Sequence, residues 1–282
     1  MTAPLELSST LEFVEALARS AGDLLRESYY RHPRRIRHKG AINLVTQADL
    51  AAERLIVSRL KARFPDYGLL AEEGGEAQGS KGECIWLIDP LDGTNNFAHG
   101  LPVFSVSIAL RDASGPILGV VYDPLRDECF SAVRGWGAML NGQPVHVSDQ
   151  ADIEKSLLST GFPYDHLDAQ DNNSAAVAAF LRRAQDIRRA GAAALDLAYV
   201  AAGRLDGHWE MRLDAWDVGA GILLVREAGG AVTGYTVDAP EQAVLSGKQV
   251  VASHGHIHAA MLDTLREVYD FSGDGSFSLK AL

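Results

Sequence analysis

The period of the apolar residues changes along this 282-residue chain from helical to strand-like, and this change restricts the fold class. Residues 9–30 and 46–64 place apolar side chains at helical spacing, which predicts two amphipathic helices. The first opens with Ser9-x-x-Glu12, a capping-box sequence. Two long helices at the start of the chain, followed by short strands, indicate a mixed α+β fold.

The middle of the chain carries short β-rich runs separated by turn residues. These runs predict a meandering, largely antiparallel sheet, with strands at 68–71, 85–88, 104–110, 117–122 and 128–133. Beyond about residue 150, alanine-rich stretches alternate with strand-like runs, which is typical of α/β structure and predicts helices at 175–184, 192–202 and 218–228. We therefore predict two units, an N-terminal α+β half at 1–150 and a C-terminal α/β half at 151–282.

Charge and cysteine content exclude several classes of protein. The 37 acidic residues outnumber the 26 basic ones, and a net charge of −11 argues against nonspecific binding to nucleic acid or anionic membranes. Two cysteines, Cys84 and Cys129, are too few for a disulfide-stapled secreted scaffold. No signal-peptide pattern or membrane-length apolar stretch is present, so we expect a cytoplasmic protein. A P-loop, a G-x-S-x-G elbow and a G-x-G-x-x-G fingerprint are also missing from the sequence.

The most informative segment is IWLIDPLDGTNNF at 85–97. An apolar strand ends in Asp89, and Asp92 follows three residues later, so two carboxylates share one turn. They would repel each other unless a cation lay between them, and Mg²⁺ with the Leu91 carbonyl as a third oxygen ligand would satisfy them. The amides of Gly93 and Thr94 would bind an anion if a helix begins there. The segment therefore indicates a metal and a phosphate.

Each acidic segment also has a simpler explanation. DPLDG on its own is equally well explained as a surface turn, because Asp, Pro and Gly are common turn formers. Glu72 and Glu73 precede two glycines and fit a solvated loop. Asp214-x-x-Asp217 fits helix capping, and Asp49 in Thr46-x-x-Asp49 fits the same explanation.

Four segments in order, AINLVTQAD, LLAEEGG, WLIDPLDGTNNF and WDVGAGILLVREAGG, together resemble the inositol monophosphatase family in its bacterial type. This family lies in the fructose bisphosphatase-like superfamily of Mg²⁺-dependent, Li⁺-sensitive phosphatases. The resemblance runs from about residue 10 to 260. It implies a layered α/β/α/β/α sandwich, with metal-binding loops in the N-terminal half and a C-terminal half that completes the metal and substrate site. It also implies a small phosphorylated metabolite as the substrate and a homodimer.

The resemblance assigns metal ligands residue by residue. Glu72, Asp89 and the carbonyl of Leu91 would bind a first Mg²⁺. Asp89 would bridge to a second ion completed by Asp92 and Asp217, and two to three ions are expected in all. Two cations suit phosphoryl transfer, because they hold the attacking and leaving oxygens and neutralise charge.

Other positions are matched to catalysis and substrate binding. Thr94 and Asp49 match the pair that orients and deprotonates the attacking water, with Glu72 nearby. The amides of Gly93 and Thr94 would hold the phosphate. Substrate hydroxyls and the pocket wall would be contacted by Glu210, Gly191 and Ala193.

The sequence departs from the family pattern at three places. Ala192 stands where relatives often carry Ser or Thr, so a hydroxyl contact is missing. Asn95 replaces the second Thr of DGTTNF, whereas Thr94 is intact. Lys39 lies about one residue from the family's lysine and is carried over as an active-site cation.

The expected reaction is hydrolysis of a phosphate monoester, with myo-inositol 1-phosphate as the first substrate. Fructose 1,6-bisphosphate, histidinol phosphate and 3′-phosphoadenosine 5′-phosphate are rivals within the same chemistry. A regulatory binding module that has kept the fold is the alternative from a different class. The basic cluster that includes Arg188 and Arg189 is interpreted as a solvated face or a subunit contact, and Trp136, Trp209 and Trp216 as core residues.

Overall fold

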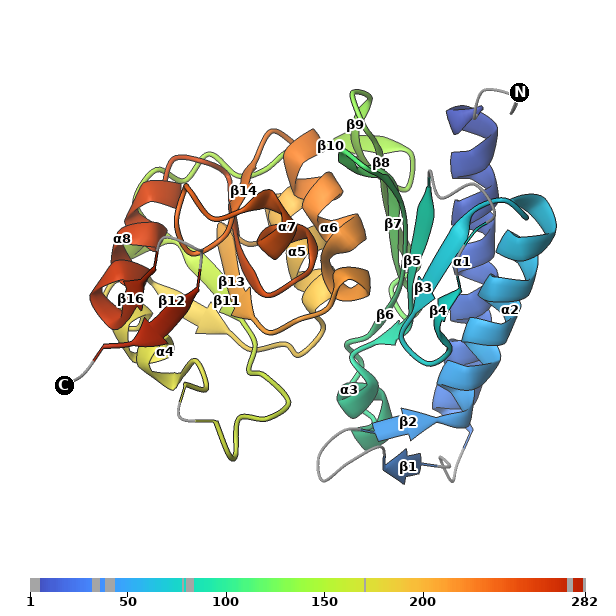
Figure 1. Ribbon diagram of the computed structural model, residues 1–282, viewed down its shortest axis with the longest axis horizontal. Helices are drawn as coiled ribbons and strands as arrows, with labels where there is room; N and C mark the ends of the chain where they lie inside the picture. Colours follow the sequence, from blue (N-terminus) through green and yellow to red (C-terminus); the bar gives the residue numbers. More distant parts are fainter. Residues whose placement is uncertain are drawn as a thin grey trace.

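Five layers of secondary structure stack side by side in the protein (Figure 1). The computed structural model describes residues 6–31, 36–38, 44–77, 79, 84–169, 171–272 and 276–280. The layers run in the order helix pair, large sheet, helix pair, smaller sheet, helix pair. The layered α/β/α/β/α sandwich expected from the resemblance is confirmed.

The helices supply the outer and central layers. α1 and α2 cover one face of the large sheet, α5 and α6 lie between the two sheets, and α4 and α8 cover the far face of the smaller sheet (Figure 1). Their bounds are α1 Leu7–Tyr30, α2 Gln47–Arg63, α3 Thr94–His99, α4 Ser174–Phe180, α5 Ala193–Ala201, α6 Ala215–Glu227, α7 Glu241–Leu245 and α8 His258–Val268, with a 3₁₀ turn, η1, at Ile153–Lys155.

The large sheet has the strand order β10-β9-β8-β7-β6-β5-β3-β4 among the described residues. It is antiparallel except for the β3–β5 pair, as the sequence predicted. Its strands are β3 Gly68–Ala71, β4 Gly75–Ala77, β5 Ile85–Asp92, β6 Ser105–Asp112, β7 Gly115–Asp123, β8 Glu128–Val133, β9 Gly137–Leu140 and β10 Gln143–Val145.

The smaller sheet has the order β12-β11-β13-β15-β14 and mixes parallel and antiparallel pairs. Its strands are β11 Leu157–Thr160, β12 Asp186–Arg188, β13 Gly207–Met211, β14 Ala231–Thr233 and β15 Gln249–Ser253. Two short hairpins lie outside both sheets, formed by β1 Ile36–His38 with β2 Leu44–Thr46 and by β16 Tyr269–Phe271 with β17 Phe277–Leu279. The division into units at 1–150 and 151–282 stays a prediction.

The first helix has the amphipathic character expected of it. Val14, Leu17, Ala21 and Leu25 repeat at helical spacing and are buried against the large sheet. The predicted capping box is wrong, because the helix begins at Leu7 with Glu6 as its N-cap, and Ser9 already lies in the first turn.

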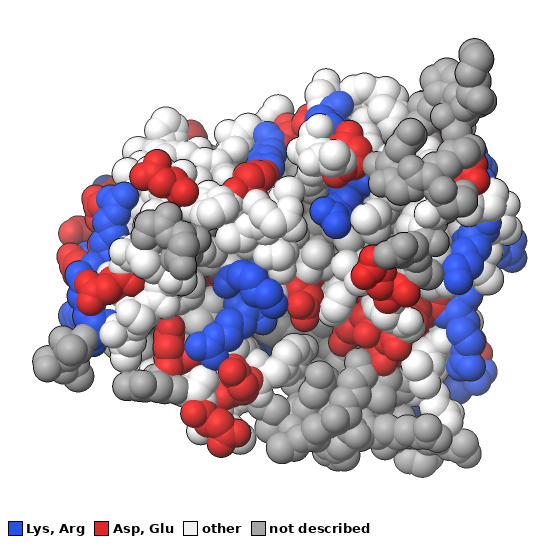
Figure 2. Space-filling model, viewed as in Figure 1, with Lys and Arg blue, Asp and Glu red and all other residues white. Residues whose placement is uncertain are grey.

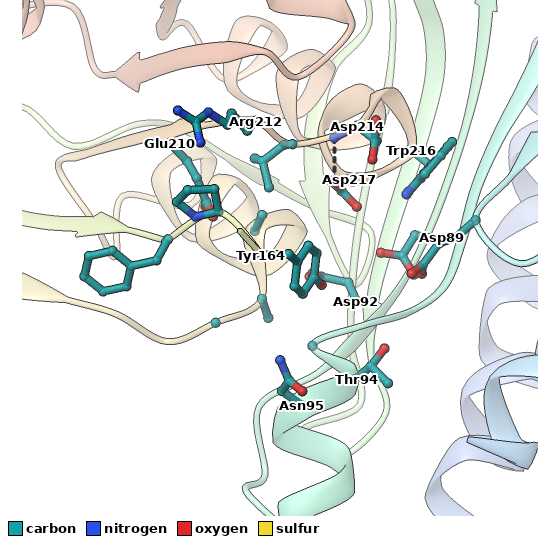
Figure 3. Close-up of a pocket in the computed structure, with 18 of the residues that line it drawn as sticks. Asp89, Asp92, Thr94, Asn95, Tyr164, Glu210, Arg212, Asp214, Trp216 and Asp217 are labelled. Carbon is teal, nitrogen blue, oxygen red and sulfur yellow. Dashed lines mark hydrogen bonds between the residues drawn. The ribbon is translucent and has the colours of Figure 1, made fainter. Parts of the chain in front are cut away.

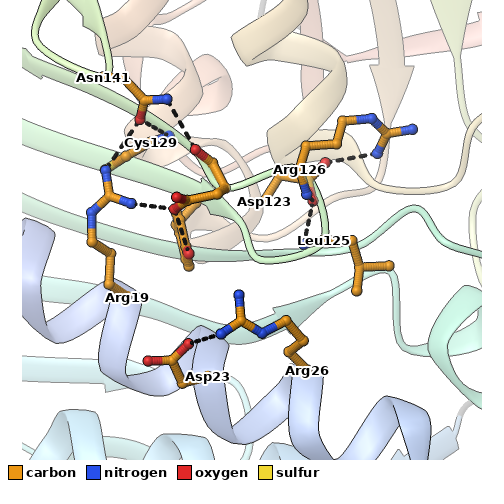
Figure 4. A network of polar contacts seen from close by, with 10 residues as sticks. Arg19, Asp23, Arg26, Asp123, Leu125, Arg126, Cys129 and Asn141 are labelled. Carbon is orange, nitrogen blue, oxygen red and sulfur yellow. Dashed lines mark hydrogen bonds and ion pairs between the residues drawn. The ribbon is translucent and has the colours of Figure 1, made fainter.

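Polar contacts connect this helix to turns at one end of the strands of the large sheet (Figure 4). Arg19 forms an ion pair with Asp127 and donates to Asn141 Oδ1 at 3.1 Å. Tyr122 Oη donates to Asp127 Oδ1 at 2.9 Å. The turn between β7 and β8 is therefore tied to α1, which holds the outer helix layer on its sheet.

The predicted core positions of two tryptophans need correction. Trp209 is fully buried as expected, but Trp136 is 53% exposed and Trp216 is only half-buried. Trp136 lies in the turn before β9, where Gly135 and Gly137 both have positive φ, so the chain reverses at the surface.

The surface carries charge of both signs. On the face seen in Figure 2, Lys and Arg side chains are interspersed with Asp and Glu. Among the described residues, none of the helices combines the length and apolarity needed to span a bilayer.

Candidate active site

The turn from β5 to α3 brings two aspartates to one side of the sheet. Residues three apart on a regular strand face opposite sides, but the pairing of β5 with β6 is irregular between Asp89 and Asp92. The Leu91 N–H donates to Asp89 Oδ1 at 2.9 Å, which fixes the turn between them. Both carboxylates consequently line one pocket.

Gly93 ends this turn and starts α3. Its φ is +90°, and a Cβ there would lie 2.9 Å from the carbonyl oxygen of Val103, so only glycine fits. Thr94 is the first residue of α3, and its Oγ1 donates to the Leu91 carbonyl oxygen at 2.9 Å. A helix does begin here, which was the condition for an anion site at the amides of Gly93 and Thr94.

Asp92 connects the end of β5 to the start of α5. Its Oδ2 accepts from Ser105 Oγ at 3.1 Å and from the amides of Ala194 at 3.0 Å and Leu195 at 3.4 Å. These amides belong to the first turn of α5, where a carboxylate is favoured by the unpaired N–H groups. Asp92 Oδ1 makes no hydrogen bond with any described residue.

Asp217 enters the pocket from the first turn of α6. Its Oδ2 accepts from the Asp214 N–H at 2.7 Å, as in a capping box (Figure 3). The capping explanation for Asp214-x-x-Asp217 is therefore correct, and Asp217 lines the pocket as well. One carboxylate oxygen caps the helix, and the other makes no hydrogen bond within the described part of the chain.

The pocket lies between the two sheets and has a volume of about 270 Å³. Its lining residues come from β5, α3, α5, β13, α6, the turn between β3 and β4, and the loops at 162–164, 189–192 and 212–214 (Figure 3). The site residues predicted from the sequence that line it are Glu72, Asp89, Leu91, Asp92, Gly93, Thr94, Gly191, Ala193, Glu210 and Asp217.

Two further site residues were predicted, of which the structure describes only one. Asp49 is buried in the first turn of α2 and does not line the pocket. Lys39 lies outside the described residues.

The buried carboxylates repel one another. Burial, and then the charges of Glu72, Asp92 and Asp217, raise the pKa of Asp89 well above its usual range. Burial raises the pKa of Asp217 in the same way. Burial also raises the pKa of Asp92 to about 7, although hydrogen bonds to Ser105 and α5 oppose the shift. Ionising all of these carboxyl groups together without a cation therefore costs free energy.

A hard divalent cation would relieve this repulsion, because the donors are carboxylate and carbonyl oxygens. Among the described residues, no three His, Cys, Asp or Glu side chains are already arranged so that they could hold a metal ion. The fit therefore rests on the kind of donor, on its burial and on the unpaired oxygens of Asp92 and Asp217. The Leu91 carbonyl and water would have to complete the ligand set.

The sequence pattern of the inositol monophosphatase family matches residues 6–269. The chain belongs to this family. Its members are phosphatases that generally depend on metal ions.

Individual relatives of this family member carry two kinds of name. The chain is 43% identical over 264 residues to the inositol-1-monophosphatase of Synechocystis sp., covering 93% of this chain and 90% of that protein. It is 42% identical over 252 residues to the Nus factor SuhB of Escherichia coli, covering 89% and 93%. The solved inositol monophosphatase from Anabaena (Nostoc) sp. matches with a TM-score of 0.83 at 40% identity, over 93% of this chain and 96% of that one.

Sequence reasoning missed one wall of the pocket in this family member. Phe162, Pro163 and Tyr164 line it, and Tyr164 points into it (Figure 3). The segment TGFPYD was noticed as part of the resemblance but given no role. The signal that could have indicated this wall is a proline between two aromatic residues in a loop after a strand. Such a local pattern does not indicate which cavity the loop borders.

Two arginines were also missed. Arg189, interpreted with its basic cluster as part of a solvated face or a subunit contact, lines the pocket. Its Cζ lies 5.7 Å from the Phe162 ring centroid. Arg212 lines it too and pairs with both carboxylate oxygens of Asp165, at 2.9 and 3.0 Å. Arg212 has a φ of +59°, a backbone conformation that the sequence around it does not predict.

Gly161 leaves room for the Glu210 carboxylate. A Cβ at position 161 would lie 1.7 Å from Glu210 Oε1, and the φ of Gly161 is not in the left-handed region. We therefore expect Gly161→Ala to lower the free energy of unfolding by about 1–3 kcal/mol through overpacking alone. Urea unfolding of Gly161→Ala in the native and Glu210→Ala backgrounds tests this. An equal loss in both backgrounds would show that the carboxylate is not what the methyl group meets.

Proposed function

We propose that this family member is a Mg²⁺-dependent phosphomonoesterase that hydrolyses a small phosphorylated polyol, with myo-inositol 1-phosphate as its first substrate. The observation that carries the proposal is the convergence of Glu72, Asp89, Asp92 and Asp217 on one pocket beside Gly93 and Thr94. The relative named inositol-1-monophosphatase supports this substrate.

The metal ligands are proposed from the same residues. Glu72, Asp89 and the Leu91 carbonyl would hold one ion, and Asp89, Asp92 and Asp217 a second. The proposal includes two to three ions in all. Bound there, Mg²⁺ would polarise the phosphoryl oxygens and lower the pKa of the attacking water.

The chain's own groups would then orient the reactants. The amides of Gly93 and Thr94 lie at the start of α3, where they would bind the phosphate oxygens. Thr94 Oγ1 is held by the Leu91 carbonyl and would direct the water toward phosphorus, with Glu72 accepting its proton. Asp49 does not line the pocket, so its proposed role is to polarise Thr94 or the water through an intermediate group.

Substrate recognition would come from the C-terminal half. Glu210 would accept hydrogen bonds from hydroxyls of the polyol, and Gly191 and Ala193 would border its ring. The backbone of the loop before α5 is held by Asn96, whose Nδ2 donates to the Ala190 carbonyl oxygen at 2.8 Å. We also carry Lys39 into the proposal as an active-site cation.

Release of inorganic phosphate from a panel of esters tests the proposal. The panel contains inositol 1-phosphate, fructose 1,6-bisphosphate, histidinol phosphate and 3′-phosphoadenosine 5′-phosphate, each with Mg²⁺ and with chelator. We expect Mg²⁺-dependent turnover that is fastest with inositol 1-phosphate and is inhibited by Li⁺. Faster turnover of another ester would show that inositol 1-phosphate is not the preferred substrate. Equal rates with Mg²⁺ and with chelator would contradict the proposed dependence on Mg²⁺.

A second candidate is a binding role, favoured by the 42% identity to a protein named Nus factor SuhB. Folded protein that releases no phosphate from any ester of the panel would favour this candidate. We also propose that the protein is a homodimer, which sedimentation of the purified protein would test. We propose a cytoplasmic location as well, which fractionation of cells would test.

A further inference from the structure

His208 and Glu210 lie two residues apart on β13, so their side chains share one face of the smaller sheet. Trp209 between them stacks on Phe180 of α4, with ring centroids 4.0 Å apart, which places that side chain on the opposite face. The face with His208 and Glu210 is turned toward α5 and the pocket. His208 is completely buried, whereas Glu210 reaches the pocket wall.

The ring of His208 is fixed from one side. Ser159 is its cross-strand partner on β11, and Ser159 Oγ lies 2.9 Å from His208 Nδ1. The other ring nitrogen, Nε2, has no hydrogen-bond partner among the described residues. It lies 3.4 Å from Glu210 Oε2.

This geometry selects one tautomer of a neutral His208 ring. A carboxylate oxygen only accepts, so a lone pair on Nε2 would repel it, whereas an N–H on Nε2 would attract it. Ser159 can then donate its O–H to the lone pair on Nδ1. The serine therefore leaves the proton on the nitrogen that faces Glu210.

We propose that His208 is a positioning residue that holds the Glu210 carboxylate toward substrate hydroxyls. The inference rests on the proposed function, in which Glu210 contacts the polyol. Rotation of the carboxylate by a small angle would complete the Nε2–H to Oε2 hydrogen bond. A carboxylate anchored through one oxygen presents the other to the ligand in a defined direction, as hydrogen-bonded partners orient the ligands of a metal.

The rest of the surroundings leave this task to His208. The backbone of Gly161 packs against the carboxylate but offers only a steric boundary. Asp196, the buried carboxyl on α5, has an Oδ1 without a hydrogen-bond partner in the described residues, so it does not hold Glu210 through that atom. Among the described Lys, Arg and His side chains, His208 is the one that lies within 4 Å of the Glu210 carboxylate.

The test compares two esters and two substitutions at one position. We expect His208→Phe to lower kcat/KM for inositol 1-phosphate about tenfold, mainly through KM, because a hydrogen bond to a charged group is lost. For p-nitrophenyl phosphate, which has no hydroxyl for Glu210 to accept from, we expect less than a twofold change. His208→Gln keeps an N–H near the position of Nε2 and should restore most of the loss. His254→Phe, at a buried histidine that does not line the pocket, is the matched control and should leave both esters unaffected.

A double-mutant cycle separates this inference from the proposed function. If Glu210→Ala leaves kcat/KM for inositol 1-phosphate unchanged, the proposed role of Glu210 is wrong and the inference fails with it. If Glu210→Ala impairs turnover but His208→Phe does not, only the inference is overturned. An additional tenfold loss from His208→Phe in the Glu210→Ala background, where no acceptor is left, also overturns it, because His208 would then act by another route.

Histidine tautomers provide a readout that is independent of activity. In ¹⁵N-histidine-labelled protein, the resonances missing from His208→Gln identify this ring. We expect a proton on Nε2 of this ring in the native protein, and a shift of its ring nitrogens in Ser159→Ala. A ring protonated at Nδ1 alone would overturn the inference.

Discussion

Asp89→Asn is expected to lower kcat/KM for phosphate ester hydrolysis by about a thousandfold or more. Asp89 is the carboxylate proposed to bridge both metal ions, so an amide in its place weakens both sites at once. A loss of this size corresponds to about 4 kcal/mol of transition-state stabilisation, in the range that metal ions supply in phosphoryl transfer. Phosphate release at saturating Mg²⁺ measures it.

The fold should survive this substitution, because Asn keeps the acceptor for the Leu91 N–H. In chelator, Asp89→Asn should be at least as stable as the native protein, since a charge buried beside Glu72, Asp92 and Asp217 is removed. Asp263→Asn, at an exposed residue of α8, is the matched control and should change neither activity nor stability. An Asp89→Asn enzyme with native turnover would refute the metal assignment.

Most of the long elements were predictable because their signals are local. The helical spacing of Val14, Leu17 and Ala21 predicted α1, and the runs at 68–71 and 128–133 match β3 and β8. Helix ends were less certain, since the predicted helix at 175–184 ends at Phe180. The order of the layers did not follow from periodicity. It came from the resemblance, because the packing of α5 and α6 between two sheets depends on contacts far apart in sequence.

The candidate site shows the same division. Asp89, Asp92 and Gly93 share one turn, so their proximity could be predicted from the sequence. Arg189 and Tyr164 reach the pocket only through the path of their loops, which no local pattern reveals. His208 was missed for a related reason, because its relation to Ser159 depends on the parallel pairing of β13 with β11.

Stability of the metal-free protein should fall as pH rises from about 4 to about 7. The pKa of Asp92 is raised from its usual 3.8 to about 7 by burial, so in this interval the folded state keeps a proton that the unfolded state has lost. Asp112 changes stability with pH in the opposite direction, because Arg134 lowers its pKa. The stability that Asp112 contributes is lost only as the pH falls below about 4. For Asp92 alone the decline is on the order of 4 kcal/mol.

Urea unfolding in chelator at pH 4 to 8, compared between the native protein and Asp92→Asn, isolates this contribution. The asparagine side chain of Asp92→Asn would still accept from Ser105 and Ala194 but would not titrate. The free energy of unfolding of Asp92→Asn should therefore decline less between about pH 4 and about pH 7 than that of the native protein. Mg²⁺ competes with protons for the same carboxylates and should stabilise the native protein more at pH 8 than at pH 5. Identical pH profiles for the two proteins would mean that Asp92 is already ionised in the folded state at pH 5, and that the pocket does not resist its charge.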